Sequence, residues 1–303
     1  MIRAVGRFAV PPQSIAHRFA VRAALCAGAL LATPLAAHAA APLGLRAEAG
    51  LSADDNVGRA SDKWGDDKRS DRIWNAGLSA SWPAQTSEHT RLILLGFAGE
   101  EKYATYGKLT HTYYGAQGEL QYRASGEFGA PTYGVVLRSA GEQYKSDLRD
   151  GFRYSVGLTA RKLVTDRIAS FASLSWLRRD SRSAAFDTRE ISARFNLDYS
   201  LSRTGTLYLG GELRHGEAVS SGRPALAYID VAKAIVADDA FDNAGFYAYK
   251  VNANTLIGTL GYNVSFGAGH ALDFSLRRAQ SKVLSADLRY TANQASLAYL
   301  VRF

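Results

Sequence analysis

Residues 191–200 read ISARFNLDYS, a stretch in which apolar and polar side chains alternate without exception. The odd-numbered positions hold Ile, Ala, Phe, Leu and Tyr, and the even-numbered positions hold Ser, Arg, Asn, Asp and Ser. Successive side chains of a β-strand point to opposite faces. This segment is therefore predicted to be a strand that separates an apolar phase from water.

The same period of two recurs along the rest of the chain. It predicts twelve strands, at residues 43–53, 72–82, 90–101, 109–123, 131–143, 151–162, 167–179, 188–200, 205–215, 251–266, 270–281 and 288–303. Two of them are ambiguous, because residues 92–95 are apolar on both faces and so are Phe171 and Leu174.

The intervals between these strands alternate in length. Those after even-numbered strands are short, whereas the longest two, residues 54–71 and 216–250, follow odd-numbered strands. Bacterial outer-membrane barrels have short periplasmic turns and longer outer loops. The pattern predicts an all-β fold, a single antiparallel up-and-down transmembrane barrel of about twelve strands with both termini in the periplasm.

A soluble β-sandwich would also show short alternating strands. The aromatic residues favour the barrel, because Trp74 and Trp82 lie eight residues apart on one face, which is ~26 Å along a strand. That distance matches an apolar band with an aromatic girdle at each edge.

Residues 1–39 are predicted to be a secretory signal peptide, with residues 40–303 as the barrel. Four arginines precede an acid-free apolar stretch from Ala23 to Leu35, which is followed by the small-residue cleavage pattern Ala37-His38-Ala39. Its removal lowers the formal net charge from +8 to +4 and removes Cys26, the single cysteine. We therefore expect no disulfide, no nucleic-acid partner and no cofactor, and an outer-membrane location in a Gram-negative bacterium.

The carboxyl-terminal strand carries Leu297, Tyr299, Val301 and Phe303 on one face and ends in that Phe. This strand resembles the closing strand of porin-like Gram-negative outer-membrane β-barrel proteins. The resemblance implies insertion by the barrel-assembly machinery and contact with outer-membrane lipid and lipopolysaccharide.

The faces opposite the apolar rows are predicted to line the lumen, with nine arginines against six acids. These are Arg46, Arg123, Arg138, Arg153, Arg161, Arg194, Arg214, Arg277 and Arg302, with Glu48, Glu119, Glu142, Asp198, Glu212 and Asp273. Most are expected in ion pairs, such as Glu212 with Arg214 or Asp273 with Arg277. The arginines in excess of the acids could form a path for anions. In this respect the chain is similar to the twelve-stranded acidic-oligosaccharide porins, whose pores are lined by arginine.

Residues 216–250 could constrict this lumen or form an external flap, because their apolar residues follow a helical spacing from Leu226 to Val236. The predicted function is an outer-membrane channel for passive diffusion of small polar solutes, with anions as a candidate class and no identified solute. The first alternative is a plugged structural, adhesive or export-assisting barrel that acts through its loops or a partner.

A hydrolase at the outer rim is the third alternative. His111 and loop acids at that end, Asp54, Asp55, Asp238 and Asp239, could form a pair that resembles the omptin proteases. We expect a solvated rim histidine and no catalytic residues. The acids of residues 54–67 are interleaved with Arg59, Lys63, Lys68 and Arg69, so we expect neutralisation within the loop and no metal site.

Overall fold

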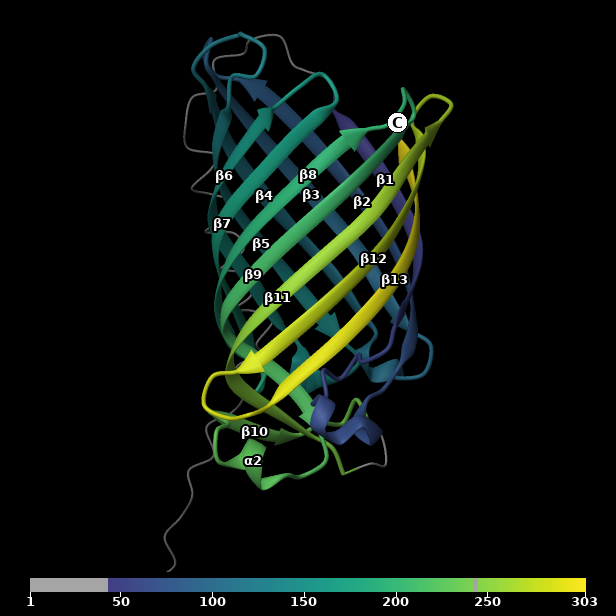
Figure 1. Cartoon of the computed structure of the whole chain (residues 1–303), viewed down its shortest axis with the longest axis vertical. Coiled ribbons are helices and arrows are strands. Elements are labelled where there is room, and N and C mark those ends of the chain that lie inside the picture. Colours follow the sequence, from purple (N-terminus) through teal and green to yellow (C-terminus); the bar gives the residue numbers. More distant parts are fainter. Residues whose placement is uncertain (1–42, 242–244) are drawn as a thin grey trace, which may run out of the picture. The chain divides into compact units, whose positions relative to one another are not determined.

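All twelve predicted strands form in the computed structural model, which describes residues 43–241 and 245–303 (Figure 1). The predicted signal peptide lies outside the described residues. The barrel strands are β1 (Gly44–Asp54), β2 (Asp71–Gln85), β3 (Thr90–Tyr103), β4 (His111–Arg123), β5 (Thr132–Tyr144), β6 (Gly151–Leu163), β7 (Ile168–Ser181), β8 (Thr188–Ser200), β9 (Gly205–Gly222), β11 (Tyr247–Phe266), β12 (His270–Val283) and β13 (Arg289–Arg302).

The barrel closes at two places in the strand order. Each strand from β1 to β8 pairs antiparallel with the next one in the chain, as do β11 and β12 with the strands that follow them. β13 returns to β1, and β9 pairs with β11 across the long segment between them. The short strand β10 (Ala234–Ala237) pairs only with the amino-terminal end of β11. Full closure leaves no barrel strand with an unpaired edge.

The two faces of the barrel wall differ sharply in chemistry. Leu78 and Leu276, on the outward face, are 67% and 62% exposed. Glu119, Glu142 and Glu212, on the inward face, are each less than 10% exposed. The alternation seen in the sequence therefore separates an apolar exterior from a charged interior.

The ambiguous segments resolve through their register. In β3, Leu92 and Leu94 share the outward face, because Leu94 is paired with Trp82. In β7, Leu174 faces outward opposite Leu158, whereas Phe171 faces inward opposite Arg161. Inward apolar side chains are tolerated here because they pack beneath arginines; the Arg161 guanidinium lies 5.3 Å from the Phe171 ring.

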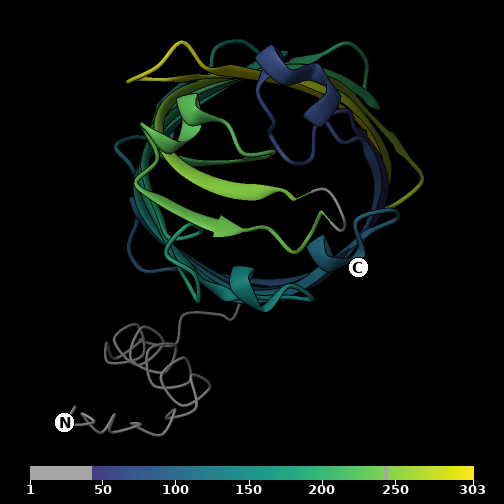
Figure 2. The ribbon, with the colours of Figure 1, turned by 90° about the horizontal axis from the view of Figure 1, so that it is seen from below.

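The segment between β9 and β11 is folded at the mouth of the barrel, and we call residues 216–241 and 245–250 the cap. It contains the carboxyl-terminal end of β9, the amino-terminal end of β11, the strand β10 and the helix α2 (Leu226–Ile229). Seen from that end, the cap and the loop with η1 (Asp62–Asp67) lie across the ring of strands (Figure 2). The helical spacing predicted a longer helix, but only one turn forms, because strand pairing with β11 takes over at Ala234.

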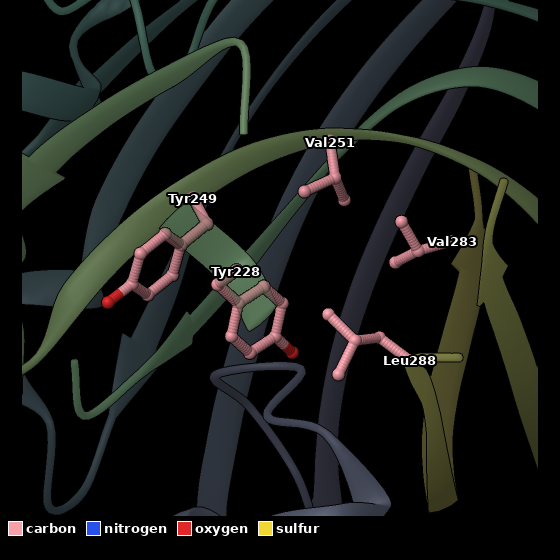
Figure 3. Packing of buried hydrophobic residues seen from close by; sticks show 5 residues of the cluster. All are labelled: Tyr228, Tyr249, Val251, Val283 and Leu288. Carbon is pink, nitrogen blue, oxygen red and sulfur yellow. The ribbon is translucent and has the colours of Figure 1, made fainter. Parts of the chain in front are cut away.

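The cap has apolar cores that it shares with the other loops at this end. In the first, Tyr228 stacks on Tyr249 with ring centroids 4.7 Å apart, beside Val251, Val283 and Leu288 (Figure 3). Two further clusters join the cap to η2 (Gly107–Leu109), to Leu148 in η3 (Asp147–Arg149), and to the loop after β7. These contacts are made with the loops at this end and with the ends of β3, β11 and β12, so the cap is anchored at this mouth of the barrel.

Candidate lumen and its cap

The strand register puts every residue predicted to line the lumen on the inward face. Directly opposed residues share a face, and the pairs include Arg46 with Arg302, Gln117 with Arg138, and Arg194 with Glu212. The inward set comprises Arg46, Glu48, Glu119, Arg123, Arg138, Arg153, Arg161, Arg194, Asp198, Glu212, Arg214, Asp273, Arg277 and Arg302.

Glu212 is the centre of the densest charge cluster on this wall. Its carboxylate accepts hydrogen bonds from Arg214 Nε at 2.6 Å, Ser192 Oγ at 2.8 Å and Arg194 at 3.0 Å. Arg214 also reaches Glu190 at 3.3 Å. The predicted pair of Glu212 with Arg214 is therefore present, and it belongs to a network in which one buried acid holds two arginines.

Two further buried acids hold arginines of the next strand or of the strand after it. Glu142 forms ion pairs with Arg153 at 3.0 Å and Arg179 at 3.1 Å. Glu119 lies 3.0 Å from Arg161. A buried carboxylate is costly unless it is paired, so these contacts stabilise the register of β4 to β7.

The predicted pair of Asp273 with Arg277 does not form. Asp273 accepts a hydrogen bond from Tyr208 at 2.8 Å and a longer one from Asn263 at 3.4 Å. These donors lie beside Asp273 on β9 and β11, whereas Arg277 is four positions further along the same strand, about 13 Å away.

Arg277 has no hydrogen bond or ion pair within residues 43–241 and 245–303. The charged groups around it include three arginines, Arg214, Arg59 and Arg194, and one acid, Glu212. Arg138 similarly has no acid partner among the described residues, and its guanidinium lies 4.1 Å from the Phe97 ring. Arg277 and Arg138 are therefore inward arginines without an acid partner among the described residues, and Arg46 and Arg302 likewise have no ion pair there.

The arginine surplus is smaller than the sequence suggested. The register adds Arg91 and Arg179 to the nine inward arginines and adds four acids to the six, so the totals become eleven and ten; the added acids are Asp54, Asp71, Glu101 and Glu190. Arg179 was missed because β7 looked apolar on both faces. Leu174 and Trp176 both face outward, and this signal in the sequence could have placed the odd-numbered residues of β7, including Arg179, on the inward face.

The end of the lumen near the chain terminus contains a cavity of about 700 Å³. Its charged lining comprises Arg46, Arg138, Arg302 and Glu48. Tyr113 and Phe97 contribute aromatic surface. Three bases against one acid give this part of the interior a net positive charge.

Buried polar contacts fasten the cap. Asp238 is 0% exposed and forms an ion pair with Arg149 at 2.6 Å, and it also accepts a hydrogen bond from Ser221 at 2.6 Å. Its neighbour Asp239 is 37% exposed and accepts a hydrogen bond from Ser146 at 2.6 Å. The cap is thus held by η3, which lies outside the barrel wall.

The acidic loop after β1 is neutralised internally, as predicted, in two pairs. Asp54 bonds to Arg59 at 2.8 Å and Asp62 to Lys68 at 2.7 Å. Burial opposes ionisation of Asp62, but hydrogen bonds from Lys68 and Thr291 outweigh it and hold the pKa of this carboxyl below its usual range. Among the described residues, no group of acids and histidines is arranged to hold a metal ion.

The acids considered for a rim hydrolase are not brought to His111. The His111 ring stacks on Tyr144 with centroids 4.2 Å apart, and its Nδ1 lies 3.1 Å from the Leu109 carbonyl oxygen. Asp54 and Asp238 are bonded to Arg59 and Arg149 instead. No Asp and His pair forms among the described residues.

The sequence matches no protein-family model and no curated protein. In structure, an outer-membrane channel from Pseudomonas putida F1 matches with a TM-score of 0.53 at 11% identity, over 89% of this chain and 100% of that one. The toluene transporter TodX from Pseudomonas putida matches at 0.42 and 10% identity, over 86% and 90%. The translocator domain of the autotransporter NalP from Neisseria meningitidis matches at 0.39 and 14% identity, over 95% and 96%.

At this identity the first likeness shows a shared fold. The chain is a closed twelve-stranded antiparallel barrel of the outer-membrane type. No helix within residues 43–241 and 245–303 is long and apolar enough to cross a membrane.

Proposed function

We propose that the protein is an outer-membrane channel through which small polar solutes diffuse, with anions favoured over cations. The observation that carries this proposal is the presence of Arg277 and Arg138 on the inner wall without an acid partner among the described residues. Such guanidinium groups can bind carboxylate or phosphate oxygens in a bidentate manner.

The arrangement of the charged residues supports a preference for anions, although the inward arginines and the inward acids are nearly equal in number. Most inward acids are engaged by arginines or by loop groups, as Glu212, Glu142 and Glu119 are. Their charge is largely cancelled locally. A passing ion therefore experiences the remaining arginines more strongly than the paired acids.

The test is conductance in planar bilayers made of neutral phospholipid. In a salt gradient, the wild-type chain is expected to give steady channels whose reversal potential indicates anion preference. Replacing both lumen arginines, in R138Q/R277Q, is expected to reduce the anion-to-cation permeability ratio a few-fold. The matched control is R178Q, because Arg178 is on the outward face of β7 and bonds to Asp180 at 2.7 Å. Unchanged selectivity in the double variant would remove the basis for anion preference.

A barrel that works through its loops is the second candidate, and the cap is the observation that favours it. The cap joins the loops at its end through three apolar clusters. If the wild-type chain and a variant with a loosened cap are both silent in bilayers, the channel proposal fails. A structural, adhesive or export-assisting role would then be the better account.

Placement in the outer membrane of a Gram-negative bacterium is part of the proposal. The outward apolar rows would contact lipid acyl chains, and the closing strand with Leu297, Tyr299, Val301 and Phe303 would be read by the barrel-assembly machinery. Trp74 and Trp82 lie on the outward face of β2, eight residues apart, as expected for an aromatic girdle. Membrane fractionation of the expressing cell tests this placement directly.

A further inference from the structure

The cavity of about 700 Å³ lies inside the barrel at the end where β1 begins and β13 ends. Arg138 of β5 and Asn263 of β11 both border it, although four strands, β6 to β9, separate these two on the shorter way around the ring. Both side chains face inward, so the cavity extends across the lumen. Its volume is within the range of sites that bind small molecules.

Two arginines of this cavity oppose each other directly. Arg46 of β1 is paired across the strands with Arg302 of β13, and both side chains are exposed to the lumen. Neither side chain has an ion pair or a hydrogen bond within residues 43–241 and 245–303, and like charges in direct opposition repel each other. Glu48, the one acid that borders the cavity, is two positions from Arg46 on the same face, about 7 Å along β1, and it forms no ion pair in the described part of the chain. The opposed arginines therefore favour an anionic group from outside the chain.

Phe97 of β3 and Tyr113 of β4 contribute aromatic surface to the same cavity. A Cβ atom at Gly115 would overlap the Phe97 ring, and a Cβ atom at Gly99 would overlap the Tyr113 ring. Each ring therefore lies over a glycine of the adjacent strand, close to the wall, and leaves the lumen beside it open. The interior of a water-filled barrel is otherwise polar, so this surface favours a solute with an apolar body.

Arg138 adds a planar cation to the aromatic surface. Its guanidinium lies 4.1 Å from the Phe97 ring and donates a hydrogen bond to Gln117 at 3.4 Å. The side chain is exposed to the lumen and has no acid partner among the described residues. Guanidinium groups stack on planar rings, so the face of Arg138 that points away from Phe97 can receive an aromatic ring.

The strand register sets the distance between the anionic part and the aromatic part of the cavity. Arg46 is paired with Ser79 of β2, and Ser79 is paired with Phe97 of β3. Arg46 and Phe97 are thus two strand spacings apart, about 10 Å. The serine between them is small, and the arginine side chain reaches over part of this distance. A carboxylate carried on a single aromatic ring can span the remainder.

The other residues at the border of the cavity fit the same kind of solute. Leu95 and Leu300 face inward and extend the apolar surface. His270, at the edge, faces outward, where its Nδ1 lies 2.7 Å from the Tyr299 hydroxyl. The rest are small or polar inward residues and apolar residues of the same strands whose side chains face outward.

We propose that this cavity binds a small aromatic carboxylate. The carboxylate lies between Arg46 and Arg302, and the ring lies against Tyr113 and the Arg138 guanidinium. Charge-assisted bonds to the guanidinium groups hold the carboxylate, and contact with the aromatic and apolar wall holds the ring. The site rests on the channel proposed above, because a solute reaches it through the lumen, and it narrows the solute class from small anions to aromatic ones.

Ligand-observed fluorine NMR of the full chain in non-ionic detergent tests the site, with para-fluorobenzoate as the probe. The wild type is expected to bind it about tenfold more tightly than fluoroacetate, which lacks the ring, or para-fluorobenzyl alcohol, which lacks the charge. The double variant R46Q/R302Q is expected to bind para-fluorobenzoate about tenfold more weakly than the wild type. Y113L is expected to weaken this binding about threefold and to leave the binding of fluoroacetate unchanged.

The matched control is R178Q/R189Q, which also removes two positive charges. Arg178 and Arg189 are directly paired on the outward face of β7 and β8, so this variant is expected to bind para-fluorobenzoate like the wild type. An equal loss in R178Q/R189Q and R46Q/R302Q would overturn the proposal, because binding would then follow net charge alone. Equal binding of para-fluorobenzoate by the wild type and either R46Q/R302Q or Y113L would overturn it too, as would equal binding of fluoroacetate and para-fluorobenzoate by the wild type.

Heat-modifiable mobility on gels checks that each variant is folded, and R46Q alone takes the place of the double variant if that variant does not fold. Binding in detergent does not require conduction. Anion-selective conductance without binding would therefore leave the channel standing and remove the site, whereas binding by a chain that is silent in bilayers would remove the channel alone.

Discussion

Replacing Asp238 by Asn is predicted to release the cap while leaving the barrel intact. The change keeps the size of the side chain and removes its charge, so the Arg149 guanidinium, 11% exposed and 2.6 Å away, is left without its carboxylate. Breaking a buried ion pair by removing one partner costs about 3–5 kcal/mol. The cost falls on the cap alone, because both residues lie outside the barrel wall.

Hydrogen exchange of cap amides measures this cost. The amide of Ser221 donates to the Gly58 carbonyl at 2.8 Å and that of Asp238 to Phe246 at 2.9 Å, so both report whether the cap is closed. A loss of about 3 kcal/mol raises their exchange rates roughly 100-fold. Exchange in the barrel strands should not change. In bilayers, the same variant is expected to increase the fraction of time the channel is open.

The neighbouring D239N variant is the matched control. Asp239 also carries a charge and bonds to the loops, but it is 37% exposed, and exposed pairs contribute about 0–1 kcal/mol. Exchange of cap amides should therefore change little. If D238N exchanges no faster than D239N, the buried ion pair does not hold the cap, and the reasoning fails.

Three further predictions concern the wall, the closing strand and the acidic loop. E212Q leaves two partly exposed arginines without their shared carboxylate and is expected to lower the free energy of unfolding in urea by about 1–3 kcal/mol, whereas E48Q, at an exposed inward position, should leave it unchanged. F303A is expected to reduce the outer-membrane level of the protein on immunoblots several-fold, and L300A, on the inward face of the same strand, should not; equal losses would contradict recognition of the terminal aromatic. The pKa of Asp62 in the folded protein lies below its ordinary value of 3.8, so its carboxylate stabilises the loop fully above pH 3.8 and loses this effect as the pH falls through the lower folded pKa. Hydrogen exchange of the Thr291 amide, which donates to Asp62, should therefore accelerate only at acid pH. D62N should remove this pH dependence of exchange.

The faces and the number of strands could be predicted because they are local properties. A period of two assigns each side chain to one face wherever a single residue such as Phe195 sets the phase, and all twelve predicted strands are present. The period of two did not assign Arg179 to a face, because Phe171 and Leu174 put apolar residues on both faces of β7. That ambiguity disappears only when the register with β6 is known.

The sequence by itself therefore determined the closed antiparallel barrel and the inward face of most of its charged residues, because alternation is encoded by neighbours along one strand. Only the tertiary structure decided which of those charges meet. Asp273 pairs with Tyr208 and not with Arg277, since the tyrosine is brought beside it from another strand. The cap was also beyond the sequence, because its core is assembled from loops far apart in the chain, with Tyr228 packed against Leu288. Long-range contacts of this kind depend on strand register and barrel closure, which no single segment specifies.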